Sequence, residues 1–134
     1  MSTVRMIFDE DNPQVKDVYQ DIRDSRNTKY IGNFWRYLAF DPLFLKNVWN
    51  DVKNLMVKET QIDKKTKEMI YMAVSITNNC SYCTHSHTAS AKKLGMTLEE
   101  HSEFLSIVGL AAKTNQIVNG LQVPIDEVFD EDAK

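Results

Sequence analysis

Residues 68–87 read EMIYMAVSITNNCSYCTHSH. Both cysteines of the chain, Cys80 and Cys83, lie in this stretch, and His87 follows four residues after Cys83. Successive residues of an α-helix are rotated by about 100° around the helix axis. On a helix Cys83 would lie about 60° from Cys80, and His87 within about 20° of Cys80, so that the three side chains share one face. Two thiols close enough to form a disulfide bond, with an imidazole one turn further on, favour a redox site.

The composition predicts one globular domain that spans residues 1–134. A chain of 134 residues with 43% hydrophobic and 26% charged residues is long enough for a single core. The net charge of −3 argues against nucleic-acid binding. The N-terminus lacks a signal peptide and no window approaches a membrane span, so we expect a cytoplasmic protein without a membrane partner. In a reducing cytosol, a Cys-x-x-Cys motif indicates catalysis or metal binding.

Helix start signals recur along the chain and predict an all-α fold. Asn12-Pro13 and Asp41-Pro42 each place an N-cap residue before a proline at the first helical position, and Asp63 can cap a further helix. A short apolar helix is expected at residues 34–40. The helix after Pro42 carries an apolar stripe of Leu45, Val48, Trp49, Val52, Leu55 and Met56.

The second half of the chain has equally clear stop signals. Asn78 and Asn79 favour a helix end over a helix interior, and a helix from about Ser81 to Leu94 is closed by Gly95. Residues 97–100, Thr-Leu-Glu-Glu, form a capping box that opens a long helix. Gly109 inside that helix predicts a close helix–helix contact. We therefore predict a bundle of about six helices, with the Cys-x-x-Cys motif at a helix N-terminus.

The chemistry expected of these residues depends on a thiolate. An unperturbed cysteine with a pKa of about 8.5 is only a few per cent ionised at pH 7. His87 can take the proton of Cys83, and Glu68 on the preceding helix can orient the imidazole. Cys80 lies near a helix N-terminus, where the macrodipole favours an anion. Once one sulfur is oxidised, the other is placed to close a disulfide before over-oxidation.

The pattern Glu-x11-Cys-x2-Cys-x3-His, at Glu68, Cys80, Cys83 and His87, resembles the signature of the alkyl hydroperoxidase D-like branch of the carboxymuconolactone decarboxylase family. The resemblance is strongest over residues 63–95. It implies an all-α fold, a redox-active disulfide, no bound cofactor, and a homo-oligomer that is a trimer or hexamer. It also implies that Cys83 meets the peroxide, that Cys80 resolves, and that His87 and Glu68 form a proton relay. An external dithiol, in some members a lipoylated protein, would re-reduce the disulfide.

Tyr82 departs from that pattern. Well-characterised peroxidases of this branch resemble Cys-Ser-His-Cys, with a histidine at the position of Tyr82. A phenol with a pKa of about 10 is a poor proton shuttle at neutral pH. We therefore expect Tyr82 to impair peroxide turnover more than thiol–disulfide exchange.

The residues leave two other functions open. One is a lyase or isomerase acting on a small carboxylated lactone, with His87 and Glu68 as the acid–base pair and no need for the cysteines. The other is a non-catalytic zinc-binding or redox-sensing module built from Cys80, Cys83, His85 and His87, although His85 and His87 point to different helix faces. Our prediction is a thiol-dependent, antioxidant peroxidase or thiol–disulfide oxidoreductase acting on a hydroperoxide or disulfide.

Overall fold

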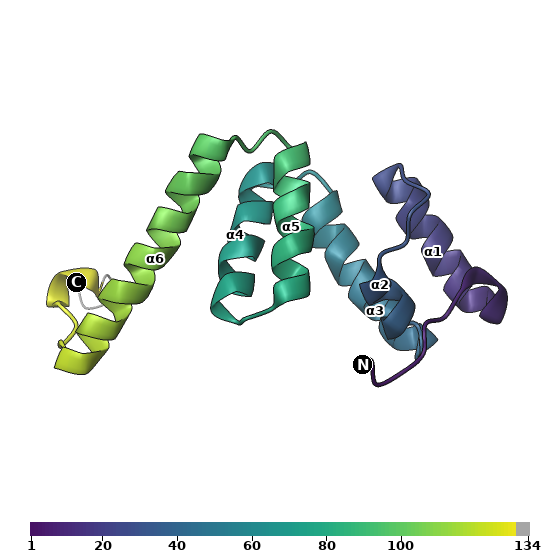
Figure 1. Cartoon of the computed structure of the whole chain (residues 1–134), viewed down its shortest axis with the longest axis horizontal. Helices are drawn as coiled ribbons and strands as arrows, with labels where there is room; N and C mark the ends of the chain where they lie inside the picture. The colour runs from purple at the N-terminus through teal and green to yellow at the C-terminus, as the bar shows by residue number, and fades with distance from the viewer. Residues whose placement is uncertain (131–134) are drawn as a thin grey trace. The chain divides into compact units, whose positions relative to one another are not determined.

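The computed structural model describes residues 1–130, and within this part of the chain all regular secondary structure is helical (Figure 1). Two short 3-10 helices, η1 (Asp9–Asp11) and η3 (Glu127–Phe129), and one π-helix, η2 (Lys53–Val57), accompany the α-helices. The six α-helices of the described residues are α1 (Pro13–Arg26), α2 (Asn33–Leu38), α3 (Pro42–Val52), α4 (Lys64–Thr77), α5 (Ser81–Lys93) and α6 (Leu98–Leu121). The prediction of an all-α fold with about six helices is confirmed for residues 1–130.

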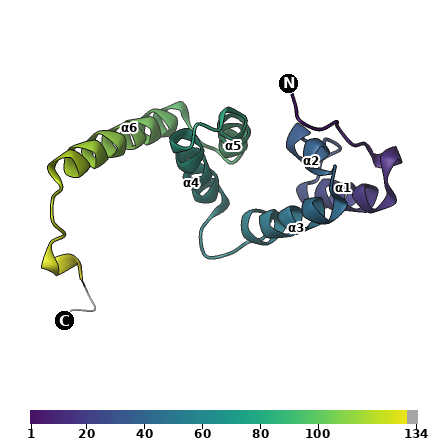
Figure 2. The same cartoon turned by 90° about the horizontal axis from the view of Figure 1, so that it is seen from below.

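The chain divides into two compact units that meet in sequence between Lys67 and Glu68. The first unit holds α1, α2, α3 and η2, and the second holds most of α4 together with α5 and α6 (Figure 2). This division does not test the prediction that residues 1–134 form a single domain, which stays a prediction. The last four residues of that range, 131–134, lie outside the described residues.

Both proline-containing start signals of the first unit cap their helices as predicted. The Asn12 Oδ1 accepts hydrogen bonds from the backbone amides two and three residues further on, at 2.8 and 3.3 Å. The Asp41 Oδ1 does the same at 3.1 Å for each amide. The prolines that follow fit because the first amide of a helix has no intrahelical acceptor. The helices of this unit bury one core of Val15, Tyr19, Ile22, Ile31, Trp35, Leu38, Ala39, Leu45 and Trp49.

The apolar stripe that begins in α3 is interrupted by the π-helix η2. The backbone N–H of Lys58 donates to the carbonyl of Lys53, five residues earlier, at 3.1 Å. A π-turn contains one more residue than an α-turn and therefore rotates the side chains that follow it. Leu55, predicted to continue the stripe, is 65% exposed, and Val57 packs against the first core instead. The prediction is wrong at Leu55 because it assumed regular α-helical spacing.

In the second unit, α4 and α5 lie side by side and run in opposite directions (Figures 1 and 2). Asp63 caps α4 as predicted, since its Oδ1 accepts a hydrogen bond from the Thr66 backbone amide at 3.0 Å. The three helices of this unit share a smaller core of Met72, Ala91, Met96 and Phe104.

The junction of α5 and α6 is built from two adjacent caps. Gly95 ends α5 with a φ of +98°, as predicted, and the backbone N–H of Met96 donates to the carbonyl of Ala91 at 3.0 Å. Thr97 and Glu100 form the predicted capping box, in which each side chain accepts from the other residue's amide at 3.0 Å. These hydrogen bonds, which end α5 and begin α6, therefore all lie between Ala91 and Glu100, a stretch of roughly three helical turns.

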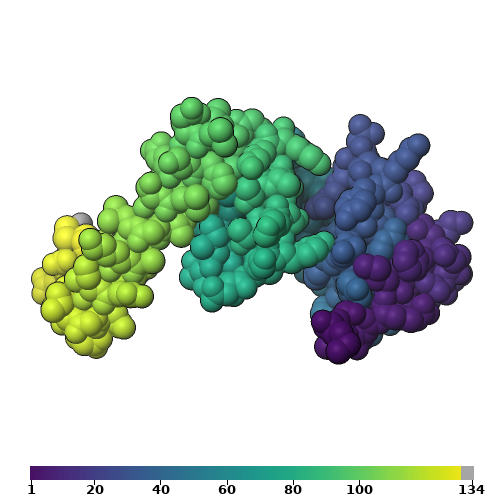
Figure 3. All heavy atoms as spheres, in the orientation of Figure 1, coloured from purple at the N-terminus to yellow at the C-terminus, as the bar shows by residue number. Residues whose placement is uncertain are grey.

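Only the first half of α6 packs against the rest of the second unit. Phe104 is buried and Val108 is partly buried, whereas every described residue from 109 to 130 is exposed. In Figure 3 the yellow-green end of α6 extends away from the other helices of the second unit. The predicted close contact at Gly109 is not made within the described residues, because a Cβ at this position would meet nothing within 4 Å. None of the helices in residues 1–130 combines the length and the hydrophobicity that a membrane span requires.

The ion pair between Asp9 and Arg23 offers a test of the first unit. Arg23 donates from Nη1 and Nη2 to the two carboxylate oxygens at 2.7 and 2.8 Å, and this guanidinium lowers the pKa of Asp9. Because the folded-state pKa is lowered, the stabilisation is complete above about pH 4 and is lost as the pH falls through the folded-state pKa. We expect Asp9→Asn to lower the free energy of unfolding by about 1–2 kcal/mol at pH 7, and by less at pH 3, in urea denaturation.

The matched control for Asp9→Asn is Asp17→Asn, which neutralises an exposed carboxylate on α1. This control should change the free energy of unfolding by less than about 0.5 kcal/mol at either pH. Equal losses in the two variants, or a loss at Asp9 that does not shrink at pH 3, would contradict the assigned ion pair.

Candidate functional site: the corner between α4 and α5

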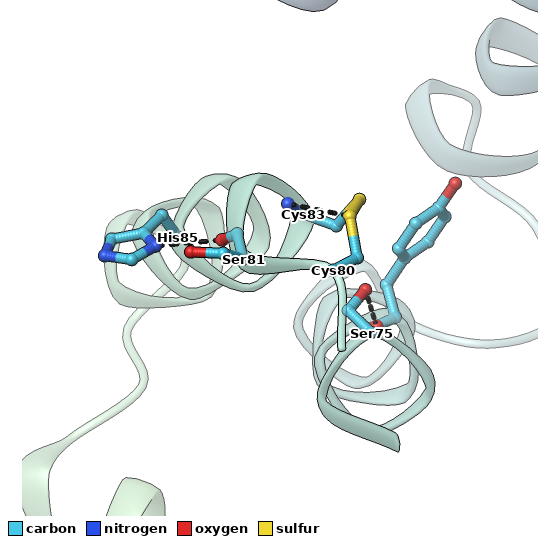
Figure 4. The surroundings of a disulfide bond; sticks show 6 residues. Ser75, Cys80, Ser81, Cys83 and His85 are labelled. Atoms are coloured by element: carbon cyan, nitrogen blue, oxygen red, sulfur yellow. Dashed lines mark hydrogen bonds between the residues drawn. A yellow bond between two sulfur atoms is a disulfide. The ribbon is translucent and has the colours of Figure 1, made fainter. Parts of the chain in front are cut away.

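The connection between α4 and α5 is closed by the backbone hydrogen bonds of a Schellman motif. The Cys80 N–H donates to the Ser75 carbonyl at 2.9 Å, and the Asn79 N–H donates to the Ile76 carbonyl at 3.2 Å. Asn79 lies in the left-handed region with a φ of 58°, which asparagine tolerates better than most residues. Cys80 is also the N-cap residue of α5, so the residue that completes the end of one helix begins the next (Figure 4).

Cys80 and Cys83 form a disulfide bond, with their Cα atoms 5.3 Å apart. This separation is in the usual range for disulfides, so the backbone of the corner accommodates the bond. The Cys80 Sγ also accepts a hydrogen bond from the Cys83 backbone amide at 3.3 Å. An amide donor at a helix N-terminus favours the thiolate form of a cysteine once the disulfide is reduced.

Contrary to the prediction from the sequence, Cys80 does not share a helix face with Cys83 and His87. With a φ of −89° and a ψ of 91°, Cys80 is extended and stands just outside the helix. The helical rotation angles that were calculated from Cys80 to Cys83 and His87 therefore do not apply. Helical geometry does apply to Cys83 and His87, which are four residues apart within α5 and are neighbours on one helix face.

His87 and Glu68 are joined across the two antiparallel helices. The His87 Nδ1 lies 2.6 Å from the Glu68 Oε2, and their side chains are only 20% and 13% exposed. An ionised carboxylate can only accept a hydrogen bond, so Nδ1 carries the proton in this pair. The other ring nitrogen, Nε2, is then the atom through which a neutral imidazole accepts a proton. The structure thus brings together the two residues that the sequence assigns to a relay, and their roles stay predictions.

Tyr71 is part of the site and was missed by reasoning from the sequence. Its ring stacks on the His87 imidazole, with 3.8 Å between the ring centroids and 21° between the planes. Tyr71 lies three residues after Glu68 on α4, and this spacing puts both side chains on one helix face. The spacing was the available signal, although it becomes informative only once His87 is known to lie against that face.

A shallow hollow of about 300 Å³ lies on the Cys80 side of the corner. The His85 Nδ1 donates to the Ser81 carbonyl at 2.8 Å, and in Figure 4 this ring points away from the disulfide. Tyr82, between the two cysteines, is half exposed. The lining residues of the hollow are mostly uncharged and polar: Ser75, Ile76, Asn79, Cys80, Ser81, Thr84 and His85.

The placement of the histidines also bears on the zinc alternative. His85 and His87 are two residues apart on α5, and each makes a hydrogen bond to a different partner, Ser81 and Glu68 respectively. Within residues 1–130, no group of three or more His, Cys, Asp or Glu side chains is placed to hold a metal ion. The four ligands of the zinc alternative are thus not gathered into a site in the described structure.

The fold and the site define a class: an all-helical protein with a Cys-x-x-Cys disulfide at the corner of two antiparallel helices, next to a hydrogen-bonded His–Glu pair. Residues 45–126 match the carboxymuconolactone decarboxylase family, and the chain belongs to this family. The sequence-based resemblance to the family is thereby confirmed.

Two known proteins give more detailed comparisons. The chain is similar to the crystal structure of the alkylhydroperoxidase AhpD core from Rhodospirillum rubrum, with 51% sequence identity and a TM-score of 0.93. That similarity covers 96% of this chain and 97% of the other. A second similarity, 40% identity over 40 residues, is to the uncharacterized protein YdfG of Bacillus subtilis, and it covers 30% of this chain. The matched segment spans only about a quarter of the length of YdfG, 27%.

The left-handed residue of the corner provides a test of how the site is held. We expect Asn79→Gly to keep or slightly raise the free energy of unfolding, because glycine adopts a positive φ without steric cost. Asn79→Val should lower it by about 1–2 kcal/mol, since a β-branched residue is strained there. Urea denaturation of the oxidised and the reduced protein measures both changes. Equal stabilities of the two variants would mean that the corner does not depend on the left-handed conformation.

Proposed function

We propose that this protein is a thiol-dependent peroxidase or thiol–disulfide oxidoreductase whose redox centre is the Cys80–Cys83 pair. The observation that carries the proposal is the disulfide at the α4–α5 corner together with the His87–Glu68 hydrogen bond. Membership of the family, and 51% identity to an alkylhydroperoxidase core, support alkylhydroperoxidase-type activity. The expected substrate is a hydroperoxide or a disulfide, and the expected electron donor is an external dithiol.

In the first half-reaction, the Cys83 thiolate attacks the terminal oxygen of a hydroperoxide. His87 accepts the thiol proton at Nε2, while Glu68 holds Nδ1 and stabilises the imidazolium that forms. The O–O bond breaks, the released alkoxide takes the proton back from His87, and Cys83 becomes a sulfenic acid. The position of His87 one helical turn after Cys83 supports this assignment.

In the second step, the Cys80 thiolate attacks the sulfenic sulfur of Cys83. The S–S bond forms, the S–O bond breaks, and the leaving hydroxide is protonated to water. Two features support Cys80 as the resolving residue: the 5.3 Å separation of the Cα atoms, and the Cys83 amide that donates to the Cys80 sulfur. The same amide favours the thiolate of Cys80 in the reduced protein.

A dithiol then reduces the disulfide and leaves as its own cyclic or intermolecular disulfide. This step transfers two electrons and two protons from the dithiol to Cys80 and Cys83. The hollow beside Cys80, whose lining residues include no Asp, Glu, Lys or Arg, supports an approach of the donor from this side. A small dithiol and the lipoyl group of a lipoylated protein are both candidates for the donor.

Replacing each cysteine by serine tests the assigned roles. We expect Cys83→Ser to lose dithiol-dependent peroxide consumption, because serine is not ionised at neutral pH and cannot become a sulfenic acid. Cys80→Ser, reduced beforehand and then freed of dithiol, should consume about one equivalent of peroxide and stop, with a sulfenic acid left at Cys83, because no second thiol of the chain resolves it. Peroxide consumption with dithiothreitol as the donor tests Cys83→Ser. A single-turnover assay without dithiol, followed by dimedone trapping and mass spectrometry, tests Cys80→Ser.

The control for this test is the double variant that lacks both thiols. Full peroxidase activity of Cys83→Ser would contradict the proposed roles. Ring opening or decarboxylation of a carboxylated lactone by the double variant would favour the lyase alternative. Stoichiometric zinc in the purified wild-type protein, with no turnover of peroxide or disulfide, would favour the metal-binding module.

We also propose that the protein is a homo-oligomer, a trimer or a hexamer. From residue 109 onward, every described residue is exposed, and exposed apolar patches of this kind commonly mark protein–protein interfaces. Gly109 leaves room for a neighbouring helix. The large apolar side chains exposed in the second half of α6 and after it are Leu110, Ile117, Val118, Leu121, Val123, Ile125, Val128 and Phe129.

Sedimentation velocity at micromolar concentration tests the assembly. We expect a mass of about three or six times 15.5 kDa for the wild-type chain. Leu110→Glu should shift the protein toward the monomer, because it places a charge on the apolar surface. Lys113→Glu, on the same helix, changes an already charged exposed side chain and serves as the control. A wild-type monomer at micromolar concentration would contradict the proposal.

A further inference from the structure

The Tyr71 side chain covers one face of the His87 imidazole. Tyr71 is 39% exposed, whereas the side chains of His87 and of its hydrogen-bond partner Glu68 are 20% and 13% exposed. The two rings are stacked at 3.8 Å with nearly parallel planes. The tyrosine thus places its ring between solvent and one face of the imidazole.

Two residues of α4 hold the imidazole in different directions. Glu68 contacts the ring in its plane, through the hydrogen bond to Nδ1, and Tyr71 contacts its face. The hydrogen bond at Nδ1 is one restraint on rotation of the ring about the Cβ–Cγ bond, and the intrinsic preference of that torsion is weak. A ring stacked on the face blocks that rotation. Both contacts are made by one helix because Glu68 and Tyr71 are three residues apart.

The turn of α4 that carries Tyr71 is tied to the redox corner. The Ser75 Oγ donates to the Tyr71 carbonyl at 2.6 Å, and the Ser75 carbonyl accepts from the Cys80 amide at 2.9 Å. Ser75 is buried beside the disulfide (Figure 4). The backbone that carries Tyr71 and the backbone that caps α5 are therefore connected through one residue.

We propose that Tyr71 is a positioning residue of the redox centre, and this inference rests on the proposed function. Its ring fixes the plane of the His87 imidazole, so that Nδ1 stays on Glu68 and Nε2 stays available to Cys83. It also keeps water away from the Nδ1–Oε2 hydrogen bond, and such charge-assisted bonds are stronger in a low-dielectric environment. The stack depends on the aromatic ring and not on the hydroxyl group.

That distinction provides a matched pair of variants in the full chain. Tyr71→Phe keeps the ring and should retain at least half of the wild-type rate of dithiol-dependent peroxide consumption. Tyr71→Leu keeps an apolar side chain without a stacking surface, and we expect it to lower the rate roughly two- to tenfold, the range that the loss of an aromatic contact gives. Circular dichroism of each variant confirms that it is folded.

A spectroscopic measurement separates positioning from general packing. In ¹⁵N NMR spectra of the reduced protein, His87 should show a single Nδ1–H tautomer in the wild type and in Tyr71→Phe. In Tyr71→Leu the ring is no longer held, and we expect a mixture of tautomers. This measurement needs no turnover, so it tests the positioning role of Tyr71 independently of activity. A wild-type protein that consumes no peroxide or disulfide would overturn the proposed function, and the NMR result would still test the role of Tyr71.

The last arm of the experiment places Tyr71→Leu in a His87→Ala background. If Tyr71 acts through His87, the substitution has no further effect there, and the two changes together equal His87→Ala alone. The inference would be overturned by an equal loss of rate in both backgrounds, by a Tyr71→Phe variant as slow as Tyr71→Leu, or by an unchanged His87 tautomer in Tyr71→Leu.

Discussion

The backbone amide of Cys80 makes the hydrogen bond on which the site depends. By donating to the Ser75 carbonyl, it completes the end of α4, and the same residue then caps α5. The reversal of direction is therefore completed within a few residues, and α4 and α5 run antiparallel. Asn79 makes this possible because it accepts the left-handed conformation that the motif requires.

The antiparallel arrangement explains how two distant residues become one pair. Glu68 lies near the start of α4 and His87 in the middle of α5, and the corner brings these two positions to the same level. Their hydrogen bond is mostly shielded from solvent, in part by Tyr71. A hydrogen bond that is shielded from water is electrostatically stronger than an exposed one, because the local dielectric constant is lower. The site thus combines a disulfide bond with an imidazole that is hydrogen-bonded at Nδ1 and stacked on one face.

The helices themselves were largely predictable from local signals. The capping residues Asn12, Asp41 and Asp63, and the box of Thr97 and Glu100, all cap the helices for which they were proposed. Caps are predictable because the hydrogen bonds involved join residues two or three positions apart. The prediction that the apolar stripe continues beyond α3 was wrong at Leu55, where a π-turn changes the helical spacing. Whether a π-turn forms depends on the packing around it, which the local sequence does not specify.

The sequence by itself determined the identity and spacing of the chemical groups: two cysteines three residues apart, a histidine one turn later and a glutamate on the preceding helix. It determined the family for the same reason, because such spacings are properties of the chain. Only the tertiary structure decided that His87 reaches Glu68, that Cys80 stands outside the helix, and that Tyr71 covers the imidazole. These contacts join residues of two different helices or depend on how a helix begins. They depend on the three-dimensional course of the backbone between α4 and α5, which the periodicity of the sequence does not specify.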